Sequence, residues 1–374
     1  QGRLDILLRH VRLFESAGHC FHAVQWPIHS NQREESAGET VNEWHLGTNF
    51  GHDAAAAAIG SSGELELAIE EGRITGEKDC RQFPINSILQ CVEAMGCPPK
   101  TWSEGWRGGG RFWWKGAHRL LTTARVDPAG ARRRMSRESE RFAEWCVWRL
   151  RLHHRLPRPR TVGHHLAHAW SLVPWGLRPG SLILVSDGTA ERACISTFHW
   201  DGERFLPLRV SHWPHSLGGL YHQAAYHVGF TGQRGPGKLM ALSAFGSPLD
   251  ESLRLVEVRD GRVVVDQSVL ATAMQDGAWR NLSPVATSGF RRMVGEADQA
   301  EEGGADFAAT IQALFTTHTI ELAFQSVDIA RGMGLCVDSV GLVGGAAMNC
   351  ETNGALRRML ANVGLSLLVS PWSN

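Results

Sequence analysis

Short apolar runs separated by turn residues dominate the part of the chain where ordered structure is first expected. A short apolar entry at 45–50 is followed by apolar runs at 54–59 and 64–70, and glycine and serine stand between these segments. This spacing is typical of hairpins, so it predicts three consecutive strands. The alanines at 54–58 also suit a helix, because alanine is the best helix former. The shortness of the run between turn residues favours a strand.

Helical periodicity follows at several places. The segment 85–95 has apolar residues three and four positions apart and is closed by glycine, which predicts a helix. A basic helix is expected at 130–153, and a long helical pattern covers 306–334. The Trp-, Gly- and Arg-rich stretch 101–115 is predicted to be a loop.

The second half of the chain repeats the order of strands, turns and helices. An apolar strand at 181–186 ends in Ser-Asp-Gly, and a hairpin with an Asp-Gly turn at 201–202 follows. A strand, a Gly-Gly turn, a helix and a final strand complete the sequence. Each half opens with a hairpin-like unit whose first turn carries aspartate near glycine, at Asp53 and Asp187. Two related α/β lobes with a cleft between them are therefore expected.

Composition argues against several classes of partner. The 374 residues are 43% hydrophobic and 20% charged with a formal net charge of +0, so no global field attracts nucleic acid or a membrane. No apolar segment has the length of a membrane span, and the scattered cysteines include no C-x-x-C pair. These features favour a cytoplasmic protein. The basic stretch 131–160 is either a solvated helix face or a contact for an anion or a partner.

Three histidines precede the strand at 181–186. His164 and His168 lie four positions apart and share a helical face, whereas His165 points elsewhere. Two imidazoles and one carboxylate suit Fe²⁺, Zn²⁺ or Mn²⁺ with open coordination positions. Asp187, at the carboxyl end of the strand, is the nearest candidate carboxylate. A histidine pair at this spacing also arises by chance on ordinary helices, so the spacing alone leaves a structural role open.

Glycine-rich turns offer candidate sites for anions. At Gly188–Thr189, backbone N–H groups can approach phosphate oxygens. A glycine-rich loop is predicted around Gly237 and Lys238, where the lysine can reach an anion as a point charge. The Gly344–Gly345 turn and Asn349 can hold a ribose or a planar ring at a helix N-terminus. Ordinary turns, an exposed lysine and close helix–strand packing explain the same patterns.

Seven segments together resemble the O-carbamoyltransferases of antibiotic and nodulation-factor biosynthesis, which include the tobramycin, cephamycin and ansamycin enzymes. They occur in the family's order over about residues 46–374: LGTNFGHDAAAA, AIEEGRITGEKDCRQFP, GHHLAHAWS, LVSDGTAE, PHSLGGLYHQAAYHVGF, GPGKLMALSAFG and VGLVGGAAMNCETNGAL. The resemblance implies an α/β fold of the actin/sugar-kinase/heat-shock-chaperone type. Its two ribonuclease H-like lobes are expected at 45–178 and 179–374, around a central cleft. Residues 1–44 would form an N-terminal extension, and about 100–160 a Trp- and Arg-rich insertion in the first lobe.

The resemblance also implies a metal site and a reaction. In that family an iron is held by the histidines of H-x-x-x-H and by a strand-end aspartate, which match His164, His168 and Asp187. Asp187 is expected to reach the histidines from the other lobe, and a fourth ligand to lie beyond Asn374. The implied reaction moves a carbamoyl group from carbamoyl-adenylate to a hydroxyl of a small-molecule acceptor. A further domain would make that adenylate from carbamoyl phosphate and ATP.

The other candidate residues take roles around this reaction. The residues expected to bind the adenylate are Gly188, Thr189, Gly237, Gly344, Gly345 and Asn349. Lys238 would stabilise phosphate charge, and His52 or Asp53 would position or deprotonate the acceptor hydroxyl. Two alternatives remain: a kinase or ATPase of the same fold with Mg²⁺ on carboxylates, and a nucleotide-binding module that is inactive as this fragment.

Overall fold

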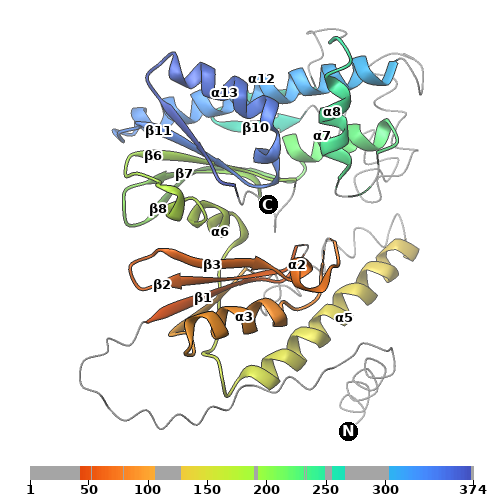
Figure 1. Cartoon of the computed structure of the whole chain (residues 1–374). Coiled ribbons are helices and arrows are strands. Elements are labelled where there is room, and N and C mark those ends of the chain that lie inside the picture. Colours follow the sequence, from red (N-terminus) through yellow and green to blue (C-terminus); the bar gives the residue numbers. More distant parts are fainter. Residues whose placement is uncertain are drawn as a thin grey trace.

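Two five-stranded sheets, one above the other in Figure 1, organise the protein. The computed structural model describes residues 43–51, 53–78, 80–105, 128–188, 193–230, 232, 234–248, 255–265 and 303–371. The first sheet has the order β3-β2-β1-β4-β5, with bounds Leu65–Glu70, Ala55–Gly60, Trp44–Asn49, Thr101–Glu104 and Arg160–Thr161. The second has the order β12-β11-β6-β7-β8, with bounds Ser366–Val369, Ser339–Val343, Ser181–Ser186, Ala193–Trp200 and Phe205–His212.

The two sheets have the same topology. In the first, β1 is antiparallel to β2 and parallel to β4, and β4 is parallel to β5. In the second, β6 is antiparallel to β7 and parallel to β11, and β11 is parallel to β12. Each half therefore begins with an antiparallel meander and adds two parallel strands on the other side of its first strand. This repetition confirms two ribonuclease H-like lobes and the actin-like α/β fold.

Helices flank both sheets. Beside the first sheet lie α2 (Glu71–Thr75), α3 (Ile85–Met95) and α5 (Pro128–Leu152). With the second sheet lie α6 (His164–Trp170), η1 (Val173–Trp175), α7 (Leu217–His227), α8 (Gly235–Ser243), α12 (Gly303–Gly332), η3 (Gly345–Met348), α13 (Cys350–Ala361) and a hairpin of β9 (Val256–Arg259) and β10 (Arg262–Val265). Within the described ranges, no helix combines the length and the apolar character that a membrane crossing requires.

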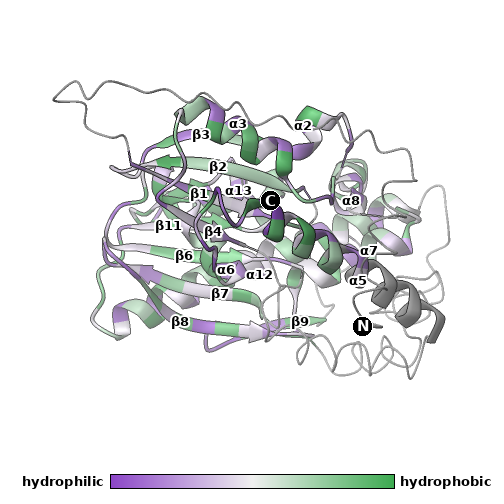
Figure 2. Cartoon of the chain, turned by 90° about the horizontal axis from the view of Figure 1, so that it is seen from below, coloured by the Kyte–Doolittle hydropathy of each residue, from purple (hydrophilic) through white to green (hydrophobic). Residues whose placement is uncertain are grey.

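Each lobe has its own apolar core. Trp44, Leu46, Ile88 and Trp102 are buried in the first core, where α3 packs on the sheet. The core of the second lobe is larger and joins its sheet to α7, α12 and α13. Figure 2 shows green apolar residues next to purple polar ones on α3, as its apolar spacing predicts. The strands predicted at 45–50, 54–59 and 64–70 and the helix at 85–95 are confirmed.

The loop predicted from residue 101 was wrong for Thr101–Glu104, which form strand β4 between β1 and β5. Trp102 and Glu104 point inward and are only 2% and 3% exposed. Trp102 donates a hydrogen bond to Thr48 Oγ1 (2.9 Å), and Trp145 of α5 donates one to Glu104 Oε1 (2.8 Å). The strand was missed because Glu104 is polar at an inward position, where a strand pattern normally has an apolar residue. The hydrogen bond from Trp145 is what allows this glutamate to be buried. Both ends of the expected insertion thus belong to the sheet, as β4 and β5.

The glycine-rich loop predicted around Gly237 was also wrong. Helix α8 begins at Gly235, and Pro236 occupies its first turn, where a missing backbone N–H is tolerated. Gly235 lies so close to Phe230 that a Cβ there would be 2.6 Å from the Phe230 carbonyl oxygen. Gly235 therefore allows close packing at the start of the helix, whereas a Cβ on Gly237 would meet no atom of the described residues within 4 Å.

Candidate metal centre

Helix α6 carries the histidine pair and packs on the second sheet. The chain leaves the first sheet at Thr161 and reaches the start of α6 within three residues. Ala169 and Leu172 are fully buried in a cluster with Ile183 and Val185 of β6. The expectation that Asp187 comes from the opposite lobe was therefore wrong. The apolar face of α6 is buried on the sheet that also carries Asp187, so all three residues belong to one packed unit.

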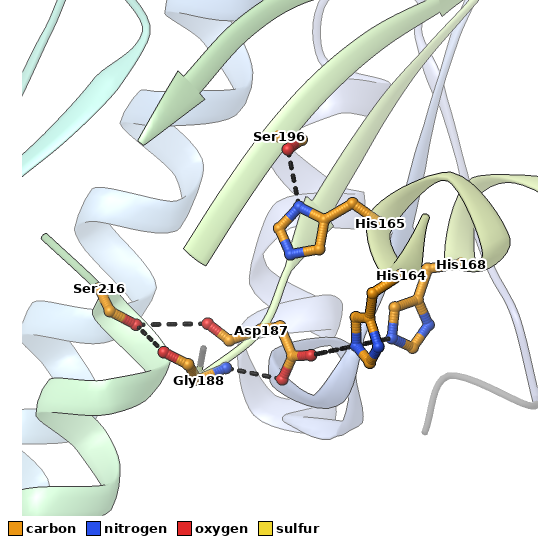
Figure 3. Close-up of polar contacts among 7 residues, drawn as sticks. All are labelled: His164, His165, His168, Asp187, Gly188, Ser196 and Ser216. Carbon is orange, nitrogen blue, oxygen red and sulfur yellow. Dashed lines mark hydrogen bonds and ion pairs between the residues drawn. The ribbon is translucent and has the colours of Figure 1, made fainter. Parts of the chain in front are cut away.

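The side chains of His164, His168 and Asp187 converge on one point (Figure 3). His164 Nε2 lies 2.8 Å from Asp187 Oδ2, and His168 Nε2 lies 3.8 Å from the same oxygen. The two Nε2 atoms are 3.1 Å apart. The three side chains are 24%, 13% and 22% exposed, so the cluster is shielded but reachable.

This geometry suits a divalent cation better than a purely hydrogen-bonded cluster. A ring nitrogen has one in-plane position, so His164 Nε2 cannot donate to Asp187 and also accept from His168. Metal–nitrogen and metal–oxygen bonds of about 2.0–2.2 Å place neighbouring ligand atoms about 3.0–3.5 Å apart. The observed separations of 2.8, 3.1 and 3.8 Å bracket that spacing. Two imidazoles and one carboxylate can therefore hold a cation here, with further positions left open.

The charge of Asp187 supports the same conclusion. Burial opposes ionisation of the carboxyl group, but hydrogen bonds and positive charge from His164 and His168 outweigh it and hold the pKa of Asp187 well below its usual range. Gly188 N–H also donates to Asp187 Oδ1 (2.7 Å), which fixes the carboxylate orientation. Asp187 is thus an oriented anion at the carboxyl end of β6.

Sequence reasoning missed two residues that support this turn. Ser216 Oγ donates to the carbonyl oxygen of Gly188 (2.6 Å) and accepts from Gly219 N–H (2.9 Å) as the N-cap of α7. Gly218 lies so close that a Cβ there would be 3.1 Å from the Asp187 carbonyl oxygen. The start of α7 is therefore fitted against the turn that presents Asp187. The N-cap pattern Ser-Leu-Gly-Gly is visible in the sequence, but its contact with residue 188 is not.

His165 is not a member of the cluster, as predicted. Its Nδ1 lies 2.7 Å from Ser196 Oγ of β7, and in Figure 3 the ring is joined to Ser196 rather than to Asp187. The residue is 7% exposed. His165 is therefore part of the packing between α6 and the second sheet.

The Gly344–Gly345 turn lies beside Asp187. Gly344 has φ +98°, and a Cβ there would be 2.4 Å from the carbonyl oxygen of Ser186. A Cβ on Gly345 would be 3.3 Å from Asp187 Oδ1, so this glycine borders the carboxylate directly. Asn349 caps α13 by accepting from Thr352 N–H (3.0 Å), and its amide also pairs with Gln312. Close packing thus accounts for Gly344, while Gly345 is the glycine that faces the candidate centre.

The remaining predicted residues are placed as follows. Asp53 lies in the β1–β2 turn with φ +53°; this turn corresponds to the β6–β7 connection that begins with Asp187 in the other lobe. His52 and Thr189 lie outside the described residues. Lys238 is exposed on α8, with its Nζ 5.8 Å from the centre of the Phe230 ring. In the described part of the chain, no hydrogen bond or ion pair links Gly237 or Lys238 to the histidine–aspartate cluster.

Together, the fold and the site define an actin-like, two-lobed α/β protein with a candidate cation centre at the end of a central strand. Comparison with known protein families identifies the family to which the chain belongs. The profile described as "Carbamoyltransferase N-terminus" matches residues 149–371, which include the whole cluster. The chain therefore belongs to the carbamoyltransferase N-terminus family, a family of transferase domains. The resemblance seen in the sequence motifs is confirmed at this level.

Other similar proteins are longer than this chain. An uncharacterised protein of Synechocystis sp. is 28% identical over 330 residues, which are 82% of this chain and 51% of that protein. Full-length HypF in its phosphate- and nucleotide-bound form has a TM-score of 0.44 at 12% identity, over 88% of this chain and 52% of HypF. HypF of T. kodakarensis has a TM-score of 0.43 at 13% identity, over 88% and 45%. The chain spans about half the length of the curated relative it matches. The fold assignment rests on the strand order rather than on these superpositions.

Proposed function

We propose that this chain is the transferase domain of an enzyme that moves a carbamoyl group from carbamoyl-adenylate to a hydroxyl of a small-molecule acceptor. The observation that carries the proposal is the convergence of His164, His168 and Asp187 beside the Gly345 turn. Family membership supports carbamoyl transfer in general. The adenylate donor and a secondary-metabolite acceptor are the more specific parts of the proposal.

The cluster would hold a divalent metal ion. Two imidazoles and a carboxylate suit Fe²⁺ first, with Zn²⁺ and Mn²⁺ as alternatives. A bound ion of this kind supplies Lewis-acid polarisation of a phosphate oxygen. Burial opposes ionisation of Asp187, but hydrogen bonds and charge from the histidines hold its pKa down, so Asp187 would bind the cation as a carboxylate and the two imidazoles would bind it in their neutral form.

The surrounding backbone would position the adenylate. Gly345 has no side chain between its backbone and Asp187 Oδ1, so a phosphate-bearing ligand could approach the Gly345 backbone next to the cation that Asp187 would help to hold. Asp53, in the β1–β2 turn of the first lobe, or His52, its neighbour in the sequence, would orient the acceptor hydroxyl or take its proton. Lys238 would act only if a ligand reaches α8.

The direct test is an assay of the protein expressed from its complete reading frame. Carbamoyl phosphate, ATP and a panel of hydroxylated acceptors are supplied with Fe²⁺ under anaerobic conditions, and acceptors are screened for a gain of one carbamoyl group by mass spectrometry. We expect a product that requires carbamoyl phosphate as well as ATP. Phosphorylated acceptor formed with ATP and Mg²⁺ alone would contradict the proposal and favour a kinase.

Variants separate the metal site from general damage to the fold. His168→Ala removes one candidate ligand and is expected to abolish product formation. His165→Gln is the matched control, because His165 lies on the same helix and packs on Ser196 instead of joining the cluster. Equal activity of His168→Ala and His165→Gln would refute a role for the cluster.

A further inference from the structure

A buried polar cluster lies directly behind the Gly345 turn, and its centre is Gln312 of α12. This side chain is 2% exposed. Its amide oxygen accepts from Tyr221 Oη (2.7 Å) and from Asn349 Nδ2 (2.9 Å). Its amide nitrogen lies 3.1 Å from Asn349 Oδ1, 3.1 Å from Thr352 Oγ1 and 3.0 Å from Thr316 Oγ1. The amide thus contacts side chains on α7, α12 and α13 at once.

The orientation of this amide is dictated by the backbone. Thr352 N–H can only donate, so the atom of Asn349 that receives it is Oδ1. The Nδ2 of Asn349 must then face Gln312 Oε1, and the Nε2 of Gln312 must face Asn349 Oδ1. A single arrangement therefore satisfies both amides, and any rotation of Gln312 leaves a buried polar group without its partner.

The partners of Gln312 control the turn beside Asp187. Asn349 ends η3 and caps α13, so its place fixes both elements. Asn353 Nδ2 donates to the Ala347 carbonyl (2.7 Å) and holds the same turn from its other side. At its start, η3 is fitted against β6, with Gly345 next to Asp187 Oδ1. The turn is clamped between the end of β6 and the Gln312 cluster.

Removing the Gln312 amide from water costs free energy that an apolar side chain at this position between three helices would not cost. The buried amide stabilises the fold only because all its hydrogen bonds are made. A fully connected amide adds directional contacts that an apolar side chain cannot, and these fix the relative positions of α12, α13 and η3. We infer that Gln312 is a positioning residue that sets the Gly345 turn against Asp187, and so determines the affinity of the site for the adenylate without touching it. The nucleotide part of this inference rests on the proposed function.

The experiment compares Gln312→Met with Gln325→Met in the protein expressed from its complete reading frame. Gln325 is a matched control on the same helix, where it donates to the Val258 carbonyl (3.0 Å) and accepts from Gly261 N–H (3.0 Å), in contact with the β9–β10 hairpin. Gln312→Glu keeps the size of the side chain but replaces the amide donor. Two quantities are measured: hydrogen–deuterium exchange of peptides covering 344–352, and affinity for AMP and for Zn²⁺ by calorimetry.

Both substitutions at Gln312 are expected to raise exchange at 344–352 and to weaken AMP binding about tenfold, the effect of losing one or two hydrogen bonds. Zn²⁺ affinity should stay within about twofold of wild type, since His164, His168 and Asp187 keep their places. Gln325→Met should change neither exchange at 344–352 nor AMP binding.

Unchanged exchange at 344–352 in Gln312→Met would overturn the inference, whatever the protein binds. AMP binding as tight as in Gln325→Met would overturn it as well. A wild-type protein that binds no AMP, while the exchange difference persists, would instead refute the proposed adenylate site, and the nucleotide part of the inference would fall with it.

Discussion

Replacing Ser216 with alanine should destabilise the second lobe measurably. The hydroxyl group of Ser216 caps α7 by accepting from Gly219 N–H and donates to the Gly188 carbonyl (2.6 Å), and the Asp187 carbonyl oxygen is a second, more distant acceptor (3.3 Å). Loss of a serine N-cap costs about 1 kcal/mol. A carbonyl group that loses its buried partner costs about 1 kcal/mol more. Because Ser216 is fully buried, water cannot readily take its place, and we expect a loss of about 2 kcal/mol in the free energy of unfolding.

The assay is urea denaturation followed by tryptophan fluorescence, in which the transition midpoint should fall while its steepness is unchanged. Ser243→Ala is the matched control. Ser243 is also buried, but its Oγ bonds only to the Met240 carbonyl within its own helix (2.7 Å), and such a bond adds little to stability. A loss below about 0.5 kcal/mol for Ser216→Ala, no larger than for Ser243→Ala, would refute the reasoning.

Two further predictions concern stability. Gly344→Ala should lower the free energy of unfolding by at least about 3 kcal/mol, because φ is +98° and the new Cβ would meet the Ser186 carbonyl oxygen. Gly364→Ala, at φ +75° with open space around the new Cβ, should lower it by only about 1 kcal/mol in the same urea titrations. Similar losses for the two variants would contradict the packing argument. Burial lowers the pKa of His222 in the folded protein, although a hydrogen bond with the Gly232 backbone opposes the shift. As the pH falls, His222 is therefore protonated in the unfolded chain before it is protonated in the folded one. The stability this residue contributes is present above about pH 6.5 and lost as the pH falls below it, so His222→Gln should flatten the decline of stability between about pH 7 and pH 5. Parallel pH profiles for wild type and variant would disagree with this.

The parts of the site that lie close together in the sequence were the predictable ones. The spacing of His164 and His168 already puts their side chains on one helical face, and the apolar run before Asp187 marks a strand end. Motif order then identified the fold, and the shared strand order of the two sheets agrees with it. The local sequence pattern is sufficient to predict the part of a site that is built from residues a few positions apart.

Long-range polar contacts were the parts that local pattern could not supply. Ser216 meets Gly188 across 28 positions, and Gln312 meets Asn349 across 37. Neither contact leaves a periodic signal, because a buried serine or glutamine looks like a surface residue until its partner is known. The same reason hid β4, whose inward Glu104 is satisfied by Trp145 from a distant helix. The sequence also could not show on which sheet α6 packs, since apolar residues such as Ala169 and Leu172 could be buried against either lobe.

The most direct test of the account is the metal content of the protein. Purified protein is loaded with Fe²⁺ without oxygen, or with Zn²⁺, freed of excess metal, and analysed by plasma emission spectroscopy. We expect a single equivalent per chain in wild type and in His165→Gln, and none in His164→Ala, His168→Ala or Asp187→Asn, with circular dichroism used to check that each variant is folded. Full metal content in the three cluster variants, or equal loss in His165→Gln, would contradict the assignment of His164, His168 and Asp187 as the metal centre.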